Sequence, residues 1–406
     1  MRISPHLHGT RATTGLGVLS LTTVVALTSF GPADAAPAGQ AARIAPNATA
    51  GILTATSALN DHNVWSVGYA QGGDSTITPL TQHWDGTGWS VAPAPVPAGR
   101  SHGQLQGVVT LSSKLAWAVG STTSDADGSS RTLAERWNGK KWKVVPTAEP
   151  DAVSSSYLQS VTAVSENDVW AVGYYYGGND GDGGTVIEHW DGTSWSLVPN
   201  ADPADAFHAS LQGVSAQSRK DVWASGFYYD PAGAGTTLIE HWNGKKWKHV
   251  DSPNSPNSPD TEFHAISAVS ANDVWATGFT TLTGSTFLPL AEHWNGKKWA
   301  IVDIAPPTGS QNTYLYAVDG LNAKDVWATG YYYSGGSYLT LAEHWNGRKW
   351  KVSPTPNTPG ALSNYLFGVS MVSSDDVWSA GGSFLSADIP FMQSWDGASW
   401  NLVPVG

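Results

Sequence analysis

Glu262 and His264 stand two positions apart in TEFHAI (261–266), and their side-chain types could do acid–base chemistry. The internal repeat described below predicts a β-strand here. Residues i and i+2 of a strand share a face, so a carboxylate and an imidazole could act together as an acid–base pair. The alternative is a wet, polar channel lining that catalyses nothing. Glu262 and His264 are therefore the candidate catalytic residues.

A second group of side chains suits the recognition of sugars. A tyrosine ring can stack on the apolar C–H face of a sugar while nearby carboxylate and amide groups bind the hydroxyls. The alternative is that tyrosine is simply favoured in strands, with many of these rings packed between sheets. The candidate ligand-binding residues are Tyr157, Gln159, Tyr175, Tyr229, Tyr314, Tyr316, Tyr332 and Tyr365.

Two patterns resemble metal sites. Asp180 and Asp182 could hold Ca²⁺ through oxygen ligands, although the full EF-hand pattern is missing and a solvated loop is the alternative. Otherwise we expect no cofactor. Glu-His pairs recur in predicted strands, as at Glu188-His189, but adjacent strand residues point to opposite faces and cannot converge on one ion. Gln82 occupies the same place as Glu188, which indicates a buried hydrogen-bond acceptor, for example for a Trp indole.

An internal repeat explains where these residues stand. The chain has 21 tryptophans, which divide into three per unit over seven units. A first Trp recurs 51 to 53 residues apart, a second follows 17 to 20 residues later, and a third always follows the second by five. The first set is Trp65, Trp117, Trp170, Trp223, Trp275, Trp327 and Trp378.

Each unit predicts four strands, as in YLQSVTAV (157–164), DVWAVGYYY (168–176), TVIEHW (185–190) and WSLVP (195–199). Asx-Gly between the second and third Trp predicts a tight hairpin with positive φ. A glycine three residues after the first Trp indicates a bulge or a close backbone approach. Seven such units predict an all-β, seven-bladed β-propeller with four antiparallel strands per blade.

With W-[DN]-G-x-x-W hairpins and VW-x-x-G strands, residues 51–406 resemble secreted bacterial Trp-rich propellers related to kelch and Asp-box repeats. The chain departs from both named patterns, because it lacks the kelch Gly-Gly pair and the Asp-box spacing. The resemblance implies the fold; a likeness to propeller lectins is analogy only.

Composition bounds the cellular setting. Residues 1–35 carry Arg2 and Arg11, a short apolar run and an A-x-A site, which predicts a signal peptide and an exported mature protein, with residues 36–50 as a linker. The chain has no cysteine and a net charge of −12, so disulfides are excluded and nucleic acid is a poor partner. We expect no membrane span and a monomer. Strand four of the last unit is complete, so ring closure need not borrow an N-terminal strand, although RIAPN (43–47) could supply one.

In a propeller the first strand of each blade lines the central channel. Counting back from the first Trp places one channel position per unit, at Thr54, Gln106, Gln159, Gln212, His264, Tyr316 and Phe367. The leading hypothesis is a secreted, lectin-like binding module that recognises a glycan or polysaccharide on an aromatic, acidic face. The alternatives are a glycoside hydrolase or lyase acting at the channel mouth, and a scaffold for extracellular proteins.

Overall fold

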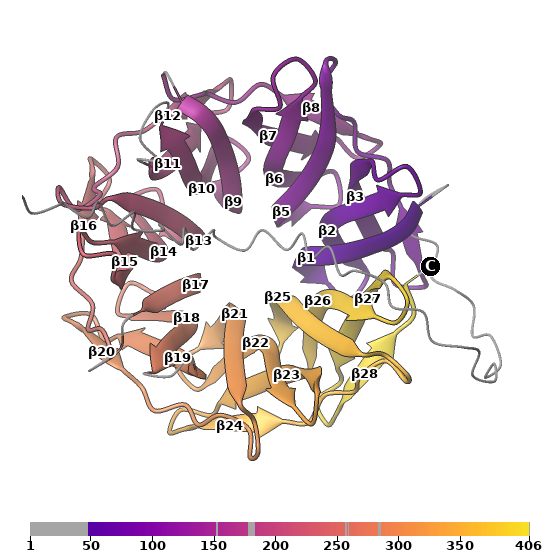
Figure 1. Cartoon of the computed structure of the whole chain (residues 1–406), viewed down its shortest axis with the longest axis vertical. Helices are drawn as coiled ribbons and strands as arrows, with labels where there is room; N and C mark the ends of the chain where they lie inside the picture. Colours follow the sequence, from indigo (N-terminus) through magenta and orange to yellow (C-terminus); the bar gives the residue numbers. More distant parts are fainter. Residues whose placement is uncertain are drawn as a thin grey trace, which may run out of the picture. The chain divides into compact units, whose positions relative to one another are not determined.

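The computed structural model describes residues 48–405, except 152, 178–182, 256, 257, 259 and 283–285. These residues belong to the compact unit Ala42–Gly406. The described part of the chain is all-β, with twenty-eight strands. It contains no helix that could cross a membrane. Taken by itself, this unit is a ring of sheets around a central opening (Figure 1).

The strands follow one another in seven four-strand sets, innermost strand first. The first strands are β1 (Ala48–Asn60), β5 (Arg100–Ser112), β9 (Val153–Ser165), β13 (His208–Ser218), β17 (Thr261–Ser270), β21 (Asn312–Asn322) and β25 (Ser363–Ser373). The second strands are β2 (Asn63–Gly72), β6 (Leu115–Ser124), β10 (Asp168–Gly177), β14 (Asp221–Tyr229), β18 (Asp273–Leu282), β22 (Asp325–Ser334) and β26 (Asp376–Phe384).

The outer strands are shorter. The third strands are β3 (Ile77–Trp84), β7 (Ser130–Trp137), β11 (Gly183–Trp190), β15 (Gly235–Trp242), β19 (Thr286–Trp294), β23 (Ser337–Trp345) and β27 (Asp388–Trp395). The fourth strands are β4 (Trp89–Val91), β8 (Trp142–Val145), β12 (Trp195–Leu197), β16 (Trp247–His249), β20 (Trp299–Ile301), β24 (Trp350–Ser353) and β28 (Trp400–Val403).

Hydrogen bonding groups these sets into three four-stranded and two eight-stranded sheets. Each eight-stranded sheet consists of two antiparallel sets joined by a single parallel pairing, Gly183 with His208 and Tyr338 with Ser363. The predicted antiparallel four-strand repeat is therefore confirmed, with two lateral links between neighbouring sets that the repeat does not suggest. The Asx-Gly hairpins are also as predicted, because Gly192 has φ 99° and Oδ1 of Asp191 accepts the amide hydrogens of Thr193 and Ser194.

A β-bulge interrupts every first strand opposite the strand-two glycine. In β13 the pairing steps from Leu211–Gly226 to Gly213–Ser225, so Gln212 is the extra residue. A Cβ on Gly226 would lie 1.9 Å from the backbone oxygen of Ser210, which explains why glycine is needed. Equivalent extra residues occur in the other six sets at Thr54, Gln106, Gln159, His264, Tyr316 and Phe367.

Tryptophans seal the interfaces between sets. The first Trp of one set meets the third Trp of the next edge to face, as in Trp65–Trp142 at 4.9 Å and 81°. Both rings are buried, and this geometry contributes to stability beyond the area it buries. The remaining pairs are Trp117–Trp195, Trp170–Trp247, Trp223–Trp299, Trp275–Trp350, Trp327–Trp400 and Trp378–Trp89.

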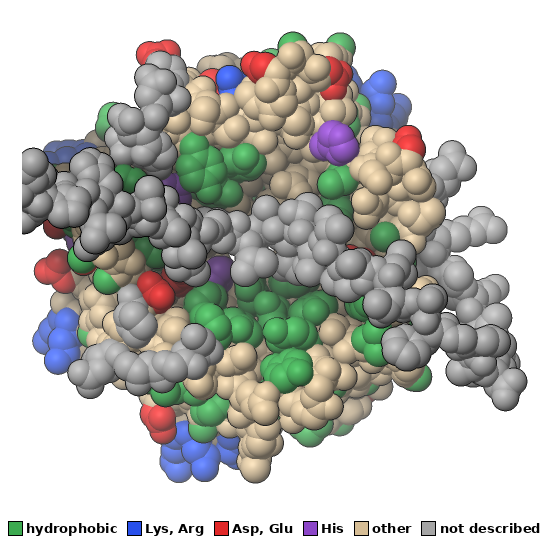
Figure 2. All heavy atoms as spheres, viewed as in Figure 1, with side chains coloured by type: hydrophobic (Ala, Val, Ile, Leu, Met, Phe, Trp, Pro, Cys, Tyr) green, Lys and Arg blue, Asp and Glu red, His purple; other side chains and the backbone are tan. Residues whose placement is uncertain are grey.

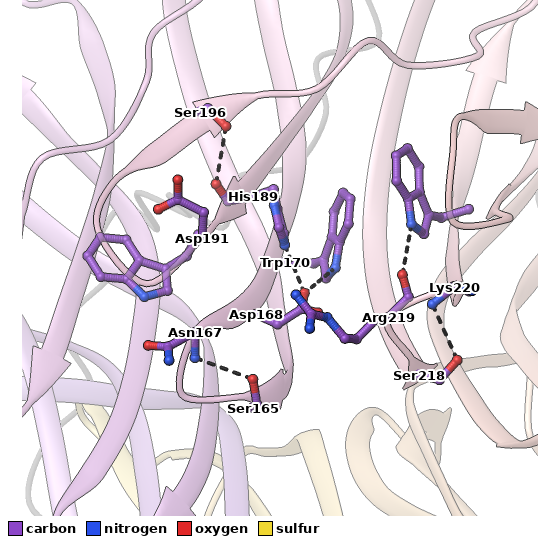
Figure 3. Close-up of polar contacts among 12 residues, drawn as sticks. Ser165, Asn167, Asp168, Trp170, His189, Asp191, Ser196, Ser218, Arg219 and Lys220 are labelled. Atoms are coloured by element: carbon purple, nitrogen blue, oxygen red, sulfur yellow. Dashed lines mark hydrogen bonds and ion pairs between the residues drawn. The ribbon is translucent and has the colours of Figure 1, made fainter.

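The strand-three Glu-His pairs are structural, as predicted. Nε2 of His189 lies 2.8 Å from Oδ1 of Asp168, and Arg219 of the next set reaches the other oxygen of Asp168 at 3.0 Å (Figure 3). On the opposite face of the strand, Glu188 is fully buried and accepts the backbone N–H of Ala148. The indole expectation is wrong here, because this backbone amide, not a Trp N–H, donates to the carboxyl.

Candidate functional site

The seven bulge residues line one cavity of about 170 Å³ at the centre of the ring. A bulge turns its extra side chain out of the regular alternation, and here all seven turn toward the axis. The channel positions predicted by counting from the first Trp are therefore confirmed. The bulge side chains are of two main kinds around the cavity wall. Gln106, Gln159 and Gln212 are amides, whereas His264, Tyr316 and Phe367 carry rings.

Glu262 lies beside His264, which lines the ring-bearing side of this cavity. Oε2 of Glu262 lies 3.6 Å from Nε2 of His264, and the two side chains are 14% and 16% exposed. Oε1 of Glu262 accepts a hydrogen bond of 3.1 Å from the hydroxyl of Tyr229, which comes from the preceding set. The His264 ring is 4.6 Å from that of Tyr316. We call Tyr229, Glu262, His264 and Tyr316 the mouth cluster.

Aromatic side chains continue from the mouth cluster around the next two sets. Tyr331 is their centre: its hydroxyl donates to that of Tyr316 at 3.2 Å, and its ring packs on Tyr314 and Tyr365 at 5.1 and 4.8 Å. Tyr314 in turn packs on Phe279, at 5.3 Å. Figure 2 shows hydrophobic side chains gathered over β21 and β25, beside the central opening.

A second aromatic group lies in β9, β10 and β13. Tyr157 stacks on Tyr174 at 4.9 Å, and Tyr176 stacks on His208 at 5.2 Å with the two rings nearly parallel. His208 is buried, and burial lowers the pKa of its imidazole. Gln159 projects into the cavity beside this group.

The remaining candidates lie elsewhere. Tyr175 packs against the core between the second and third sets, and Tyr332 against the core between the fifth and sixth. Ligand contact by these two stays a prediction and forms no part of the site proposed below. Asp180 and Asp182 lie outside the described residues. Within the described ranges, no three His, Asp or Glu side chains gather as a metal site would require.

Burial and nearby carboxylates raise the pKa values of the tyrosines at the mouth. Desolvation and the hydrogen bond with Tyr331 act in opposite directions on Tyr316, and desolvation prevails to place its pKa at about 12. For Tyr229, desolvation is the larger cause and the charge of Glu262 the next. These phenols therefore stay neutral at physiological pH and act as hydrogen-bond donors or acceptors.

The two aromatic groups contain tyrosines from the same stretches after the strand-two glycines that are not among the candidates named above. Tyr331 and Tyr176 stand one and three positions after their strand-two glycines, on the face that Tyr175 and Tyr332 do not share. Counting alternate residues from that glycine would have found them, because side chains alternate across a strand.

No protein-family model and no curated protein sequence matches the chain. Among solved structures, an ulvan lyase of a new polysaccharide lyase family, bound to -[GlcA(1-4)Rha3S]-, is 10% identical with a TM-score of 0.55 over 88% of this chain and 93% of that one. The β-propeller domain of the Trilobed protease from Pyrococcus furiosus, with an open velcro topology, is 11% identical with a TM-score of 0.50 over 87% and 98%.

A Hadza microbial sialidase is 12% identical, with a TM-score of 0.50 over 79% of this chain and 73% of its own. At these identities the likeness is one of fold. Together with the repeated four-strand antiparallel sets, it places the chain among β-propeller folds.

Proposed function

We propose that each four-strand set is one blade of a seven-bladed propeller, and that the protein binds carbohydrate at the mouth of its central channel. We also propose that residues 1–35 are a signal peptide and that the mature chain acts outside the cell. The proposal rests chiefly on the mouth cluster, where a partly exposed carboxylate stands among a phenol, an imidazole and aromatic rings.

The two sides of the channel supply the two kinds of contact that sugars need. Rings at His264, Tyr316 and Phe367 offer stacking surfaces, while amides at Gln106, Gln159 and Gln212 offer donors and acceptors for hydroxyls. The fold-level likeness to an ulvan lyase and a sialidase is compatible with a saccharide ligand, as an analogy between folds.

Binding of the mature protein, residues 36–406, to a broad glycan panel tests this function. Glu262→Gln is expected to weaken binding about tenfold, because a hydrogen bond to a charged acceptor is worth about 1.5–3 kcal/mol. Glu166→Gln is the matched control, since Glu166 is exposed in the β9–β10 turn at the opposite ends of the strands. Equal loss in both variants, or no glycan bound at all, would remove the carbohydrate function and favour a protein partner. Repeating the panel with and without Ca²⁺ tests the Asp180–Asp182 hypothesis.

A second candidate is catalysis on the bound saccharide. It is favoured by one observation, the approach of Glu262 to His264 at 3.6 Å, which brings two proton-transfer groups to one place. The groups that contact Glu262 are a phenol and an imidazole, which suits proton abstraction better than the carboxylate pair of a glycosidase. Product formation from any bound glycan, lost in His264→Ala, would support catalysis; an unchanged rate in that variant would exclude this site.

A further inference from the structure

One oxygen of Glu262 is left for a ligand. Oε1 accepts the Tyr229 hydroxyl hydrogen, whereas Oε2 makes no hydrogen bond within the described part of the chain and stands 3.6 Å from His264. The side chain is 14% exposed, so solvent reaches a carboxylate that is otherwise enclosed. A charged acceptor held by a neighbour and open on one side is suited to a charged donor.

Two groups that contact this carboxylate, Tyr229 and His264, are packed against further rings. His264 lies 5.1 Å from Phe279 and 4.6 Å from Tyr316, and Tyr229 lies 5.6 Å from Phe227. A ligand cation within about 6 Å of a ring face is attracted by the ring's quadrupole, more strongly where water is excluded. A carboxylate combined with aromatic faces therefore favours an ammonium group over a neutral hydroxyl.

Carboxylates act on the phenols around the mouth, and the His264 imidazole is a base that stands 3.6 Å from Glu262. Desolvation is the largest cause that raises the pKa of Tyr229, Tyr316, Tyr69 and Tyr365. The charge of Glu262 raises the pKa of Tyr229 and Tyr316 further, and that of Asp388 raises the pKa of Tyr69 and Tyr365, while hydrogen bonds lower it at Tyr316 and Tyr365. Apart from neighbouring phenols, the groups whose charge acts on these four tyrosines are carboxylates. On the face seen in Figure 2, Lys and Arg side chains lie toward the periphery. An anionic sugar would meet repulsion here, and a cationic one attraction.

We propose that the saccharide recognised at the mouth carries free amino groups, and that Glu262 binds their ammonium form against the surrounding rings. The ligand class is then a polymer of unacetylated amino sugars. This inference rests on the proposed carbohydrate function and adds to it the charge of the ligand.

A matched ligand pair tests the charge directly. Chitosan hexamer and chitin hexamer share length and linkage and differ in the acetyl groups, so only the first is cationic at pH 6. Calorimetry with residues 36–406 is expected to show chitosan hexamer binding about tenfold more tightly at low salt, with the preference shrinking as salt is added. Glu262→Gln should abolish the preference, while Glu166→Gln should keep it.

The outcomes separate the two proposals. Equal or tighter binding of chitin hexamer, or a preference that survives Glu262→Gln, overturns the amino-sugar inference and leaves carbohydrate binding standing. The same holds if neither hexamer binds but another panel glycan does. Failure of every glycan overturns both proposals. Oligolysine of equal charge binding as tightly as chitosan hexamer would show recognition of cations in general and overturn the saccharide assignment. The wild-type ligand pair and salt series remain decisive even if a variant does not fold.

Discussion

Buried carboxyls are an unusual feature of the third strands. Glu292 is fully buried, neither of its oxygens has a hydrogen-bond partner among the described residues, and desolvation raises its pKa to about 9. Gln82 and Gln393 occupy the same place in the first and last sets. A protonated Glu and a Gln have nearly the same shape and no charge, so the position selects a neutral polar side chain. In the remaining four sets this position is a buried glutamate: Glu135, Glu188, Glu240 and Glu343.

Glu292→Gln is therefore expected to stabilise the protein increasingly as pH rises. The folded pKa of about 9 lies above the ordinary value of 4.5, so this group's contribution is fully present below pH 4.5 and is lost as pH rises toward 9. The glutamine does not titrate. Between pH 5 and pH 9, urea unfolding should show the variant gaining on the order of 5 kcal/mol relative to wild type, because each pH unit between the two pKa values is worth about 1.4 kcal/mol. A difference that stays constant with pH, or that appears equally in Glu166→Gln, would contradict this.

At the scale of strands, the bulge in each first strand is what makes the site. The glycine three residues after Trp170 indicated a bulge or a close approach, and both occur together, since Gly173 lies under the backbone of Tyr157. Counting back from the first Trp of each unit also located the channel positions, because each of them stands eleven residues before that Trp.

Other features of the site depend on contacts that no local pattern records. The hydrogen bond from Tyr229 to Glu262 joins two neighbouring sets through residues that stand 33 positions apart. Alternation along a strand groups the tyrosines by face, but neither alternation nor β-propensity says which of the two faces lies at the channel. Tyr174 is buried beside Tyr157, whereas Tyr175 packs toward the neighbouring set.

The close approach of the backbones at the bulge predicts a large loss of folding stability for any side chain larger than glycine at the strand-two glycine. In Gly226→Ala the new Cβ would be placed 1.9 Å from the backbone oxygen of Ser210, so a strand must move. We expect a loss of about 3 kcal/mol or more in urea unfolding, as for other overpacked interiors. Gly88→Ala is the control, since a Cβ at Gly88 has nothing within 4 Å, and it should be nearly neutral. Similar stabilities for the two variants would mean that the close approach is not needed.

At the scale of the whole unit, the tryptophan pairs form a closed cycle. Six pairs join consecutive sets at centroid distances of 4.9 to 5.7 Å, and the seventh, Trp378–Trp89 at 5.9 Å, joins the last set to the first. β1–β4 and β25–β28 are each built from consecutive residues, so in the described part of the chain the first and last sets meet by packing rather than in a shared sheet. RIAPN (43–47) lies outside the described residues.

The closure should therefore be the interface most sensitive to loss of its tryptophan. Trp89 packs there with Leu53, Met392 and Val405 in one core, and within residues 48–405 these two sets are not consecutive along the chain. Elsewhere a short connection keeps neighbouring sets together after a contact weakens, which lowers the entropic cost of re-forming it. Trp89→Ala should thus lose more stability than Trp247→Ala, beyond the roughly 3–5 kcal/mol expected for either buried ring. Urea unfolding followed by circular dichroism compares the two variants. If Trp247→Ala lowers the free energy of unfolding as much as Trp89→Ala or more, the covalent connection adds nothing to the interior interfaces. The ring would then unfold as one cooperative body.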